Sequence, residues 1–195
     1  MPLTLPVVFP FAFNKVPDKT YTALAQKFVR RVKELRGKVY QLTDFNTPEI
    51  DGIDGCFRSQ NGEFGHWYFS AMDLCPLQEF LRLDADINLP YGIPSVPGNY
   101  EIAVPKEIKG VMNNGVVFVR NRHFFFDGIS AYHKTTRNGW NDIQVATQMV
   151  IDSGEYRVKK LDPYIYNWMP TYKDQRNPEA LIVHYEGPER KAWMP

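Results

Sequence analysis

The sequence predicts an α+β fold in which one N-terminal amphipathic helix packs on a mainly antiparallel, meander-like β-sheet, with extended proline- and aromatic-rich arms at both ends. Three observations lead to this prediction: a helical periodicity over 18–36, short apolar runs between frequent turn signals, and proline and aromatic residues gathered at both ends. We expect an arm over 1–17, a single α+β domain over 18–161 and a C-terminal arm or extension over 162–195.

The composition is that of an ordinary globular protein. A length of 195 residues fits one domain, and 44% apolar with 23% charged residues is enough to build a core. The net charge of +1 gives no overall field that would attract nucleic acid or an anionic membrane, so binding to nucleic acid is possible only through a local patch and is not favoured. The two cysteines, Cys56 and Cys75, do not make a disulfide framework, and whether they pair stays open.

The first seventeen residues predict an extended arm. Pro2, Pro6 and Pro10 recur every four residues and prevent a helix long enough for a signal peptide or a membrane span. The first basic residue, Lys15, follows the apolar stretch, whereas in a signal peptide the basic residues come first. We therefore expect a cytoplasmic protein, in the host cytoplasm or the virion if it is viral, without a signal peptide or a transmembrane segment.

Both arms carry large apolar side chains. Leaving each one in water costs roughly 1.5 to 3 kcal/mol, so they must be covered, either by this domain or by a partner. Apolar segments of this kind often mark association. The candidate interaction residues are Leu5, Val7, Phe9, Phe11, Phe13, Tyr166, Trp168 and Trp193. The alternative is that both arms fold back on their own domain as edge strands and cover.

The most regular element is a helix from Asp18 to Arg36, whose apolar residues recur at helical spacing. Asp18 is the expected N-cap, and Gly37 stands where a left-handed C-terminal cap is expected. The opposite face is basic, and it is either solvated or able to bind an anionic partner. Its candidate residues are Lys27, Arg30, Arg31 and Lys38.

Turn signals divide much of the remaining chain into candidate strands of an antiparallel meander. These candidates are 39–42, 56–59, 63–70, 115–120, 123–126, 129–135 and 180–185. Asn61-Gly62 predicts a hairpin turn, and Pro76 can begin a short helix that ends at Leu83. Residues 142–152 fit both a helix and a strand, and their β-branched content narrowly favours a strand.

One string could carry catalysis. His123-Phe-Phe-Phe-Asp127-Gly128 matches HxxxDG and resembles the catalytic motif of chloramphenicol acetyltransferase and related coenzyme A-dependent acyltransferases and condensation domains. The resemblance implies that His123 is a general base and that Asp127 supports the site. The second histidine that precedes the motif in that family is Arg122 here. The alternative is that Asp127-Gly128 turns a hairpin.

Motifs for metals and cofactors are missing from the sequence. The histidines and cysteines show no CxxC, HxH or HExxH spacing, and neither a P-loop nor a GxSxG string is present. The acidic turns Asp51-Gly52 and Asp54-Gly55 lack the ligand spacing of a calcium loop. We therefore expect no cofactor and no metal.

These observations favour a structural or assembly subunit that associates through its arms, with itself or in a larger assembly, and they lean against an enzyme. The composition suggests a phage or virus particle component such as a neck, tail, baseplate or capsid accessory protein. Two alternatives remain. One is a small enzyme of the acyltransferase type that uses His123 and Asp127, and the other is an intracellular protein-binding or inhibitor module. We expect protein partners and no membrane.

Overall fold

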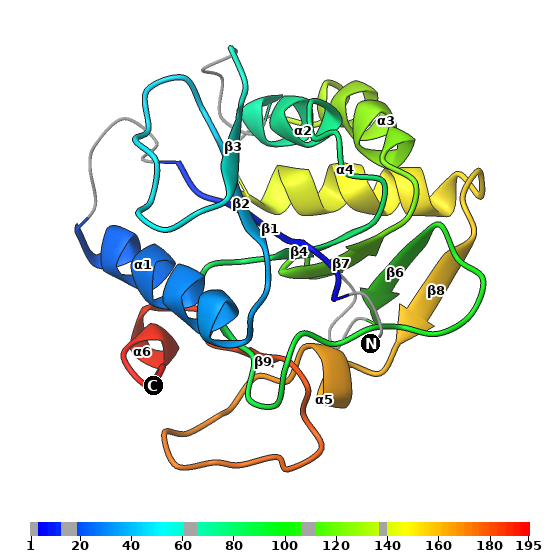
Figure 1. Ribbon diagram of the computed structural model, residues 1–195. Coiled ribbons are helices and arrows are strands. Elements are labelled where there is room, and N and C mark those ends of the chain that lie inside the picture. Colours follow the sequence, from blue (N-terminus) through cyan, green and yellow to red (C-terminus); the bar gives the residue numbers. More distant parts are fainter. Residues whose placement is uncertain (1–3, 13–18, 61–65, 107–111, 137–139) are drawn as a thin grey trace.

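A computed structural model describes residues 4–12, 19–60, 66–106, 112–136 and 140–195 (Figure 1). Its centre is a seven-stranded sheet in the order β3-β2-β1-β4-β7-β6-β8. The seven strands are β1 (Val7–Pro10), β2 (Val39–Thr43), β3 (Gly55–Arg58), β4 (Phe80–Leu83), β6 (Ile102–Pro105), β7 (Val116–Val119) and β8 (Val158–Leu161). A second, two-stranded sheet pairs β5 (Ile87–Asn88) with β9 (Val183–His184).

The large sheet is mixed and mostly parallel. β1 runs parallel to both β2 and β4, β2 runs parallel to β3, and β6 runs parallel to β8. Only β7 is antiparallel to its neighbours, β4 and β6. The predicted antiparallel meander with a single helix is therefore wrong. Parallel neighbours cannot be joined by tight turns and need long crossover connections, which are usually helices. Several segments predicted as strands form helices of this kind.

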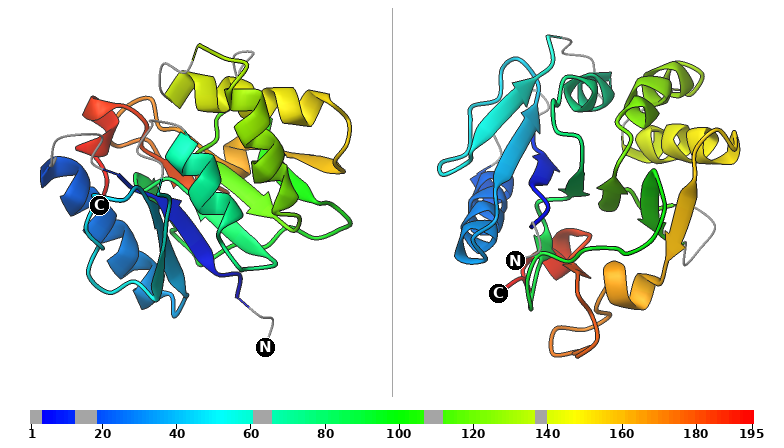
Figure 2. Two further views of the ribbon diagram at one scale, coloured as in Figure 1. Left: turned by 90° about the horizontal axis from the view of Figure 1, so that it is seen from above. Right: turned by 45° about the vertical axis from the view of Figure 1, so that its right-hand side comes forward.

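The described residues form six helices, which cover the sheet in two layers (Figures 1 and 2). They are α1 (Lys19–Glu34), α2 (His66–Asp73), α3 (His123–Tyr132), α4 (Trp140–Asp152), α5 (Pro163–Tyr166) and α6 (Pro188–Lys191). α2, α3 and α4 pack on one face of the sheet in an aromatic-rich core, and α1 packs on the other face with the small sheet. None of the helices in the described part of the chain combines the length and the apolar composition that a membrane crossing requires.

The predicted N-terminal arm is a central strand. Val7 and Phe9 are fully buried on the α1 side, and Val8 is fully buried on the opposite side, because successive side chains of a strand point to opposite faces. Phe11 is also buried and Leu5 is half-buried, whereas Phe13 lies outside the described residues. The candidate interaction residues of this segment are thus core residues, and the segment does not project toward a partner.

The predicted C-terminal arm also folds back on its own domain. Tyr166 packs edge-on against Phe118 of β7, and Trp168 forms a bridge to Val183. Trp193 is half-buried. Figure 1 shows this segment passing beneath the sheet, so that α6 lies beside α1. The arms predicted from composition are therefore parts of the core and of its cover.

Several secondary-structure predictions are wrong for a common reason. Residues 66–73, 123–132 and 140–152 are helices, whereas strands were expected, and 80–83 is a strand within an expected helix. α2 and α3 carry large buried side chains on several sides, so no clean amphipathic period is visible in their sequences. The helix over 19–34 and the strands at 39–43, 55–58 and 116–119 are confirmed.

The predicted details of turns and caps have mixed outcomes. Asp18 and Asn61-Gly62 lie outside the described residues. At the end of α1, Arg36 has the left-handed conformation with φ 57°, one residue before the expected Gly37. The amide of Gly37 then donates to the carbonyl of Val32, which closes the helix with a Schellman-type bond.

Cys56 and Cys75 are both free thiols.

Candidate functional site

A pocket of about 500 Å³ lies beyond the carboxyl ends of β1 and β4. The strand order reverses at β1. The next two strands in the chain, β2 and β3, lie on one side of β1, and β4 and the later strands of the large sheet lie on its other side. In open α/β sheets, ligands bind in the crevice at such a reversal of strand order. The lining comes from segments far apart in the sequence: Pro10–Ala12, Asp84–Asp86, Asn113–Gly115, the start of α4, and the segment from His184 to Lys191.

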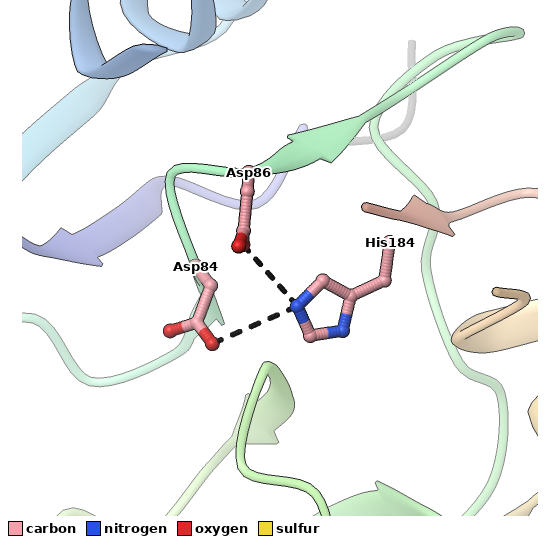
Figure 3. Close-up of side chains that lie close together, drawn as sticks. All are labelled: Asp84, Asp86 and His184. Atoms are coloured by element: carbon pink, nitrogen blue, oxygen red, sulfur yellow. Dashed lines mark ion pairs between the residues drawn. The ribbon is translucent and has the colours of Figure 1, made fainter. Parts of the chain in front are cut away.

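Three potential metal ligands meet in this pocket. The side chains of Asp84, Asp86 and His184 point toward one another (Figure 3), and one ligand atom of each lies within 4.8 Å of the others. The Nε2 atom of His184 is 3.2 Å from Oδ1 of Asp86 and 3.9 Å from Oδ2 of Asp84. The two carboxylates follow directly after β4 with one residue between them, and this spacing favours the same side of an extended chain.

A buried amide fixes the orientation of the histidine ring. The Nδ1 atom of His184 lies 3.0 Å from Oδ1 of Asn167, and both residues are buried. Because an amide oxygen only accepts, Nδ1 must carry the proton of this hydrogen bond. The other ring nitrogen, Nε2, is thereby turned toward the carboxylates. Histidines that bind metals are held in the same way, through a hydrogen bond from the second ring nitrogen.

Charges balance one another at the base of the pocket. Burial alone would raise the pKa of the Asp86 carboxyl, but His184 and Lys191 hold it below its ordinary value. Burial would lower the pKa of His184, and the facing carboxylates, mainly that of Asp86, raise it instead. The Nζ atom of Lys191 lies 3.1 Å from Oδ2 of Asp86 and donates to the hydroxyl of Tyr21 at 2.6 Å. The carboxylate of Asp86 therefore faces the imidazole and the ammonium, whereas the carboxylate of Asp84 pairs with the guanidinium of Arg82 at 2.7 Å.

This donor set fits a divalent cation. Oδ1 of Asp86 is buried and has no hydrogen-bond partner in the described structure, although it is within ion-pair distance of His184. Two carboxylates and one imidazole are hard or intermediate ligands that suit Mg²⁺ or Mn²⁺. These cations commonly take one or two carboxylates from the protein and fill their remaining positions with water or with the phosphates of a substrate.

Without a bound cation, the stability of the chain is expected to peak in mildly acidic solution. The lowered pKa of Asp86 stabilises the fold above about pH 4, and this contribution is lost as the pH falls through the folded-state value. The raised pKa of His184 stabilises the fold below about pH 6.5, and this contribution is lost as the pH rises through the folded-state value. Thermal unfolding in EDTA should therefore give a higher midpoint at pH 5.5 than at pH 8.5. A His184→Asn variant should show a smaller difference, and an equal difference in both proteins would remove His184 as the cause.

The residues of the HxxxDG string lie elsewhere. His123 is exposed at the start of α3, and the Asp127 carboxylate accepts a hydrogen bond from the hydroxyl of Tyr156. Neither residue lines the pocket. Gly128 does not turn a hairpin but lies in α3 against the ring of Phe69, where an added Cβ would come within 2.4 Å of a ring carbon and force a shift. The string therefore belongs to a packed helix, away from the pocket described above.

The basic face of α1 is partly used inside the molecule. Arg31 donates through Nε and Nη2 to the carbonyl of Leu89, and Lys27 donates to the carbonyl of Met194. Arg30 and Lys38 are exposed. Binding of an anionic partner by this face stays a prediction.

The sequence analysis missed the acidic pair and predicted no metal. The signal in the sequence is Asp-x-Asp directly after a mainly apolar segment. Because the sequence analysis predicts a helix over 76–83, it misses the end of β4, which positions Asp84 and Asp86. His184 gave no signal of its own. It reaches the pair because β9 pairs with β5, which immediately follows the two aspartates.

No protein-family model and no curated protein sequence matches the chain. Solved structures do. The glycosyltransferase GlyE of Streptococcus pneumoniae superposes with a TM-score of 0.67 and 16% identity over 97% of this chain and 59% of GlyE. A glycosyltransferase involved in glycosylation of the major capsid of PBCV-1 gives 0.63 and 18%, over 97% and 98% of the two chains. The galactosyltransferase LgtC gives 0.59 and 13%, over 94% and 88%.

This is the GT-A glycosyltransferase fold. The GT-A fold overturns the expectation of a structural or viral assembly subunit, because the solved chains that share the fold are glycosyltransferases. The same finding counts against the protein-binding or inhibitor module. The chain spans 59% of the length of GlyE and nearly all of the PBCV-1 protein. Association with itself or with other proteins stays a prediction.

Proposed function

We propose that the chain is a metal-dependent glycosyltransferase that moves a sugar from a nucleotide-sugar donor to an acceptor hydroxyl. One observation carries this proposal: Asp84, Asp86 and His184 converge in the pocket at the strand-order reversal of a GT-A fold. In the solved glycosyltransferase LgtC, donor and acceptor sugar analogues are bound to a chain of the same fold.

The charges of the pocket favour a diphosphate. When Asp84 and Asp86 hold a divalent cation and His184 binds through a neutral ring, the carboxylates are neutralised and the ammonium of Lys191 loses its partner oxygen. The guanidinium of Arg82 loses the charge of Asp84 in the same way, so a doubly negative diphosphate would match the two positive charges that remain. The pocket volume of about 500 Å³ lies in the range of small-molecule sites.

In the proposed reaction, the bond between the anomeric carbon and the diphosphate oxygen breaks, and the diphosphate keeps the electron pair. A new bond forms between that carbon and the acceptor oxygen, whose proton is released. The cation would neutralise the charge that develops on the leaving diphosphate. Lys191, which stands next to Asp86, supplies a further positive charge on the same side of the pocket.

Calorimetry on the full chain tests the proposal. A panel of UDP, GDP, CDP and ADP is titrated with and without Mn²⁺, and the nucleoside diphosphate that binds is then offered as its sugar conjugates in a hydrolysis assay. We expect one nucleoside diphosphate to bind at least tenfold more tightly with Mn²⁺ than in EDTA. If none of the panel binds in either condition, or if binding is the same in EDTA, the proposal is wrong.

A further inference from the structure

Arg82 is a buried arginine beside the carboxylate pair. It stands on β4, two residues before Asp84, and its side chain is 1% exposed. Its Nη2 atom lies 2.7 Å from Oδ1 of Asp84, and its guanidinium lies over the ring of Tyr68 on α2, 5.1 Å from the centroid. Its Nε and Nη1 atoms have no hydrogen-bond partner in the described structure. Among the described side chains, Asp84 is therefore the one anion that Arg82 contacts.

This arrangement is unfavourable for folding. A buried donor that gives up water without gaining a partner destabilises the fold, more so when it carries a charge. An apolar side chain of similar size often stabilises a buried site as well as an ion pair does. The role of Arg82 is therefore better explained by its effect on the carboxylate that it contacts than by its contribution to the core.

The two oxygens of each carboxylate in the cluster have different partners. Oδ1 of Asp84 pairs with Arg82, while Oδ2 lies 3.9 Å from Nε2 of His184. Oδ2 of Asp86 pairs with Lys191, while Oδ1 lies 3.2 Å from the same ring nitrogen. Figure 3 shows one oxygen of Asp84 turned toward the histidine and the other turned away. Each carboxylate therefore offers one oxygen to a cation in the cluster, and a basic side chain holds the other oxygen.

These contacts also balance the charge of the cluster. The guanidinium and the ammonium match the two carboxylates, so these four groups together are neutral. Glu186 is the other charged residue of the pocket lining, but it is exposed and water screens its charge. With a neutral His184 ring, a divalent cation that binds without an anion makes the cluster doubly positive. Both basic side chains then repel the cation.

We propose that Arg82 is a positioning residue that weakens the binding of a free cation through Asp84. It ties back Oδ1, so that the cation receives only Oδ2 of this carboxylate and keeps more of its positions open for phosphate oxygens. Its charge opposes the cation and attracts the diphosphate. The cation is therefore held firmly only when the diphosphate is bound as well. This inference rests on the proposed function and assigns to Arg82 the control of when the cation binds.

The test measures the cation and the diphosphate separately on the full chain. Calorimetry gives the dissociation constants of Mn²⁺ alone, of UDP, GDP, CDP and ADP in EDTA, and of the same nucleotides with Mn²⁺. The proteins are the wild type, the neutral variants Arg82→Met and Arg82→Gln, and the charge-preserving variant Arg82→Lys. Arg120→Met is the matched control, because it removes the same charge where Arg120 stacks on Tyr100 outside the pocket. Thermal unfolding in EDTA is recorded for each protein.

We expect both neutral variants to bind Mn²⁺ alone about tenfold more tightly than the wild type, because a like charge beside the ligand is lost and Oδ1 of Asp84 is freed. The nucleoside diphosphate should bind about threefold more weakly in EDTA, since it loses an attractive charge. Arg82→Lys and Arg120→Met should stay within about threefold of the wild type in both measurements. An arginine that only supported the fold would give the opposite sign, because its loss would leave Asp84 less ordered and weaken the binding of Mn²⁺.

The inference is overturned, with the proposed function intact, if the folded neutral variants bind Mn²⁺ no more tightly than the wild type while Mn²⁺ still strengthens nucleotide binding by the wild type. It is also overturned if Arg120→Met gives the same gain in Mn²⁺ affinity, or if neither neutral variant folds, which would make Arg82 a structural residue. If the wild type binds no nucleoside diphosphate in either condition, the proposed function fails, and this inference fails with it.

Discussion

Asp86→Asn should lower the rate of sugar transfer or donor hydrolysis by about 100- to 1000-fold, the scale on which loss of one preorganised charge-stabilising group acts. The carboxylate of Asp86 is more enclosed than that of Asp84, pairs with Lys191 and faces His184. An amide keeps the shape of the side chain but removes the negative charge that a cation needs. The affinity for Mn²⁺ should fall together with the rate.

A second acidic residue provides the matched control for this variant. Asp51 stands exposed in a surface turn far along the chain from the pocket residues, so Asp51→Asn should leave both the rate and the Mn²⁺ affinity unchanged. Circular dichroism at the assay temperature checks that each variant is folded. A folded Asp86→Asn protein that keeps its rate within tenfold and its Mn²⁺ affinity would falsify the assignment of this residue as a ligand.

Phe9→Ala should lower the free energy of unfolding by about 3 to 5 kcal/mol, the usual range for removing a buried phenylalanine ring. Phe9 is fully buried in the central strand β1, and its ring centre lies 5.4 Å from that of Phe28 on α1. In a chain of this length the thermal midpoint should fall by roughly 10 °C. Denaturant titration gives the free energy directly.

The control for this variant is Phe45→Ala. Phe45 is 59% exposed, so its replacement should change the free energy of unfolding by no more than about 0.5 kcal/mol. The mass in solution should be the same for both variants and the wild type. If Phe9→Ala left the stability unchanged and altered the mass, the first segment would be a contact with a partner, as its composition suggested, and not a core strand.

The elements that could be predicted from the sequence are those whose pattern is local and one-sided. α1 buries one stripe of apolar residues and exposes the rest, so its period is visible. β2 and β7 are short apolar runs between turns. By contrast, α3 buries Phe124 and Phe125 in succession. The sequence pattern of a helix with a broad buried surface cannot be distinguished from that of a buried strand.

The site could be predicted only in part, for a related reason. Asp84 and Asp86 are close in the sequence, and a correct assignment of β4 would have placed them together at a strand end. His184 joins them through the pairing of β5 with β9, which no local pattern in the sequence encodes. The arms were misjudged because composition shows that apolar residues must be covered but does not show which part of the chain covers them.

His184 and Lys191 follow all seven strands of the large sheet in chain order, and this order bears on when the proposed centre forms during translation. A nascent chain that has left the ribosome as far as β8 holds both aspartates but neither the imidazole nor the ammonium that faces them. Premature termination between β8 and β9 would therefore yield a polypeptide with most of its core strands and no competent centre. Under the proposed function, the centre would therefore be complete only once β9 and α6 have been synthesised, after the strands of the large sheet.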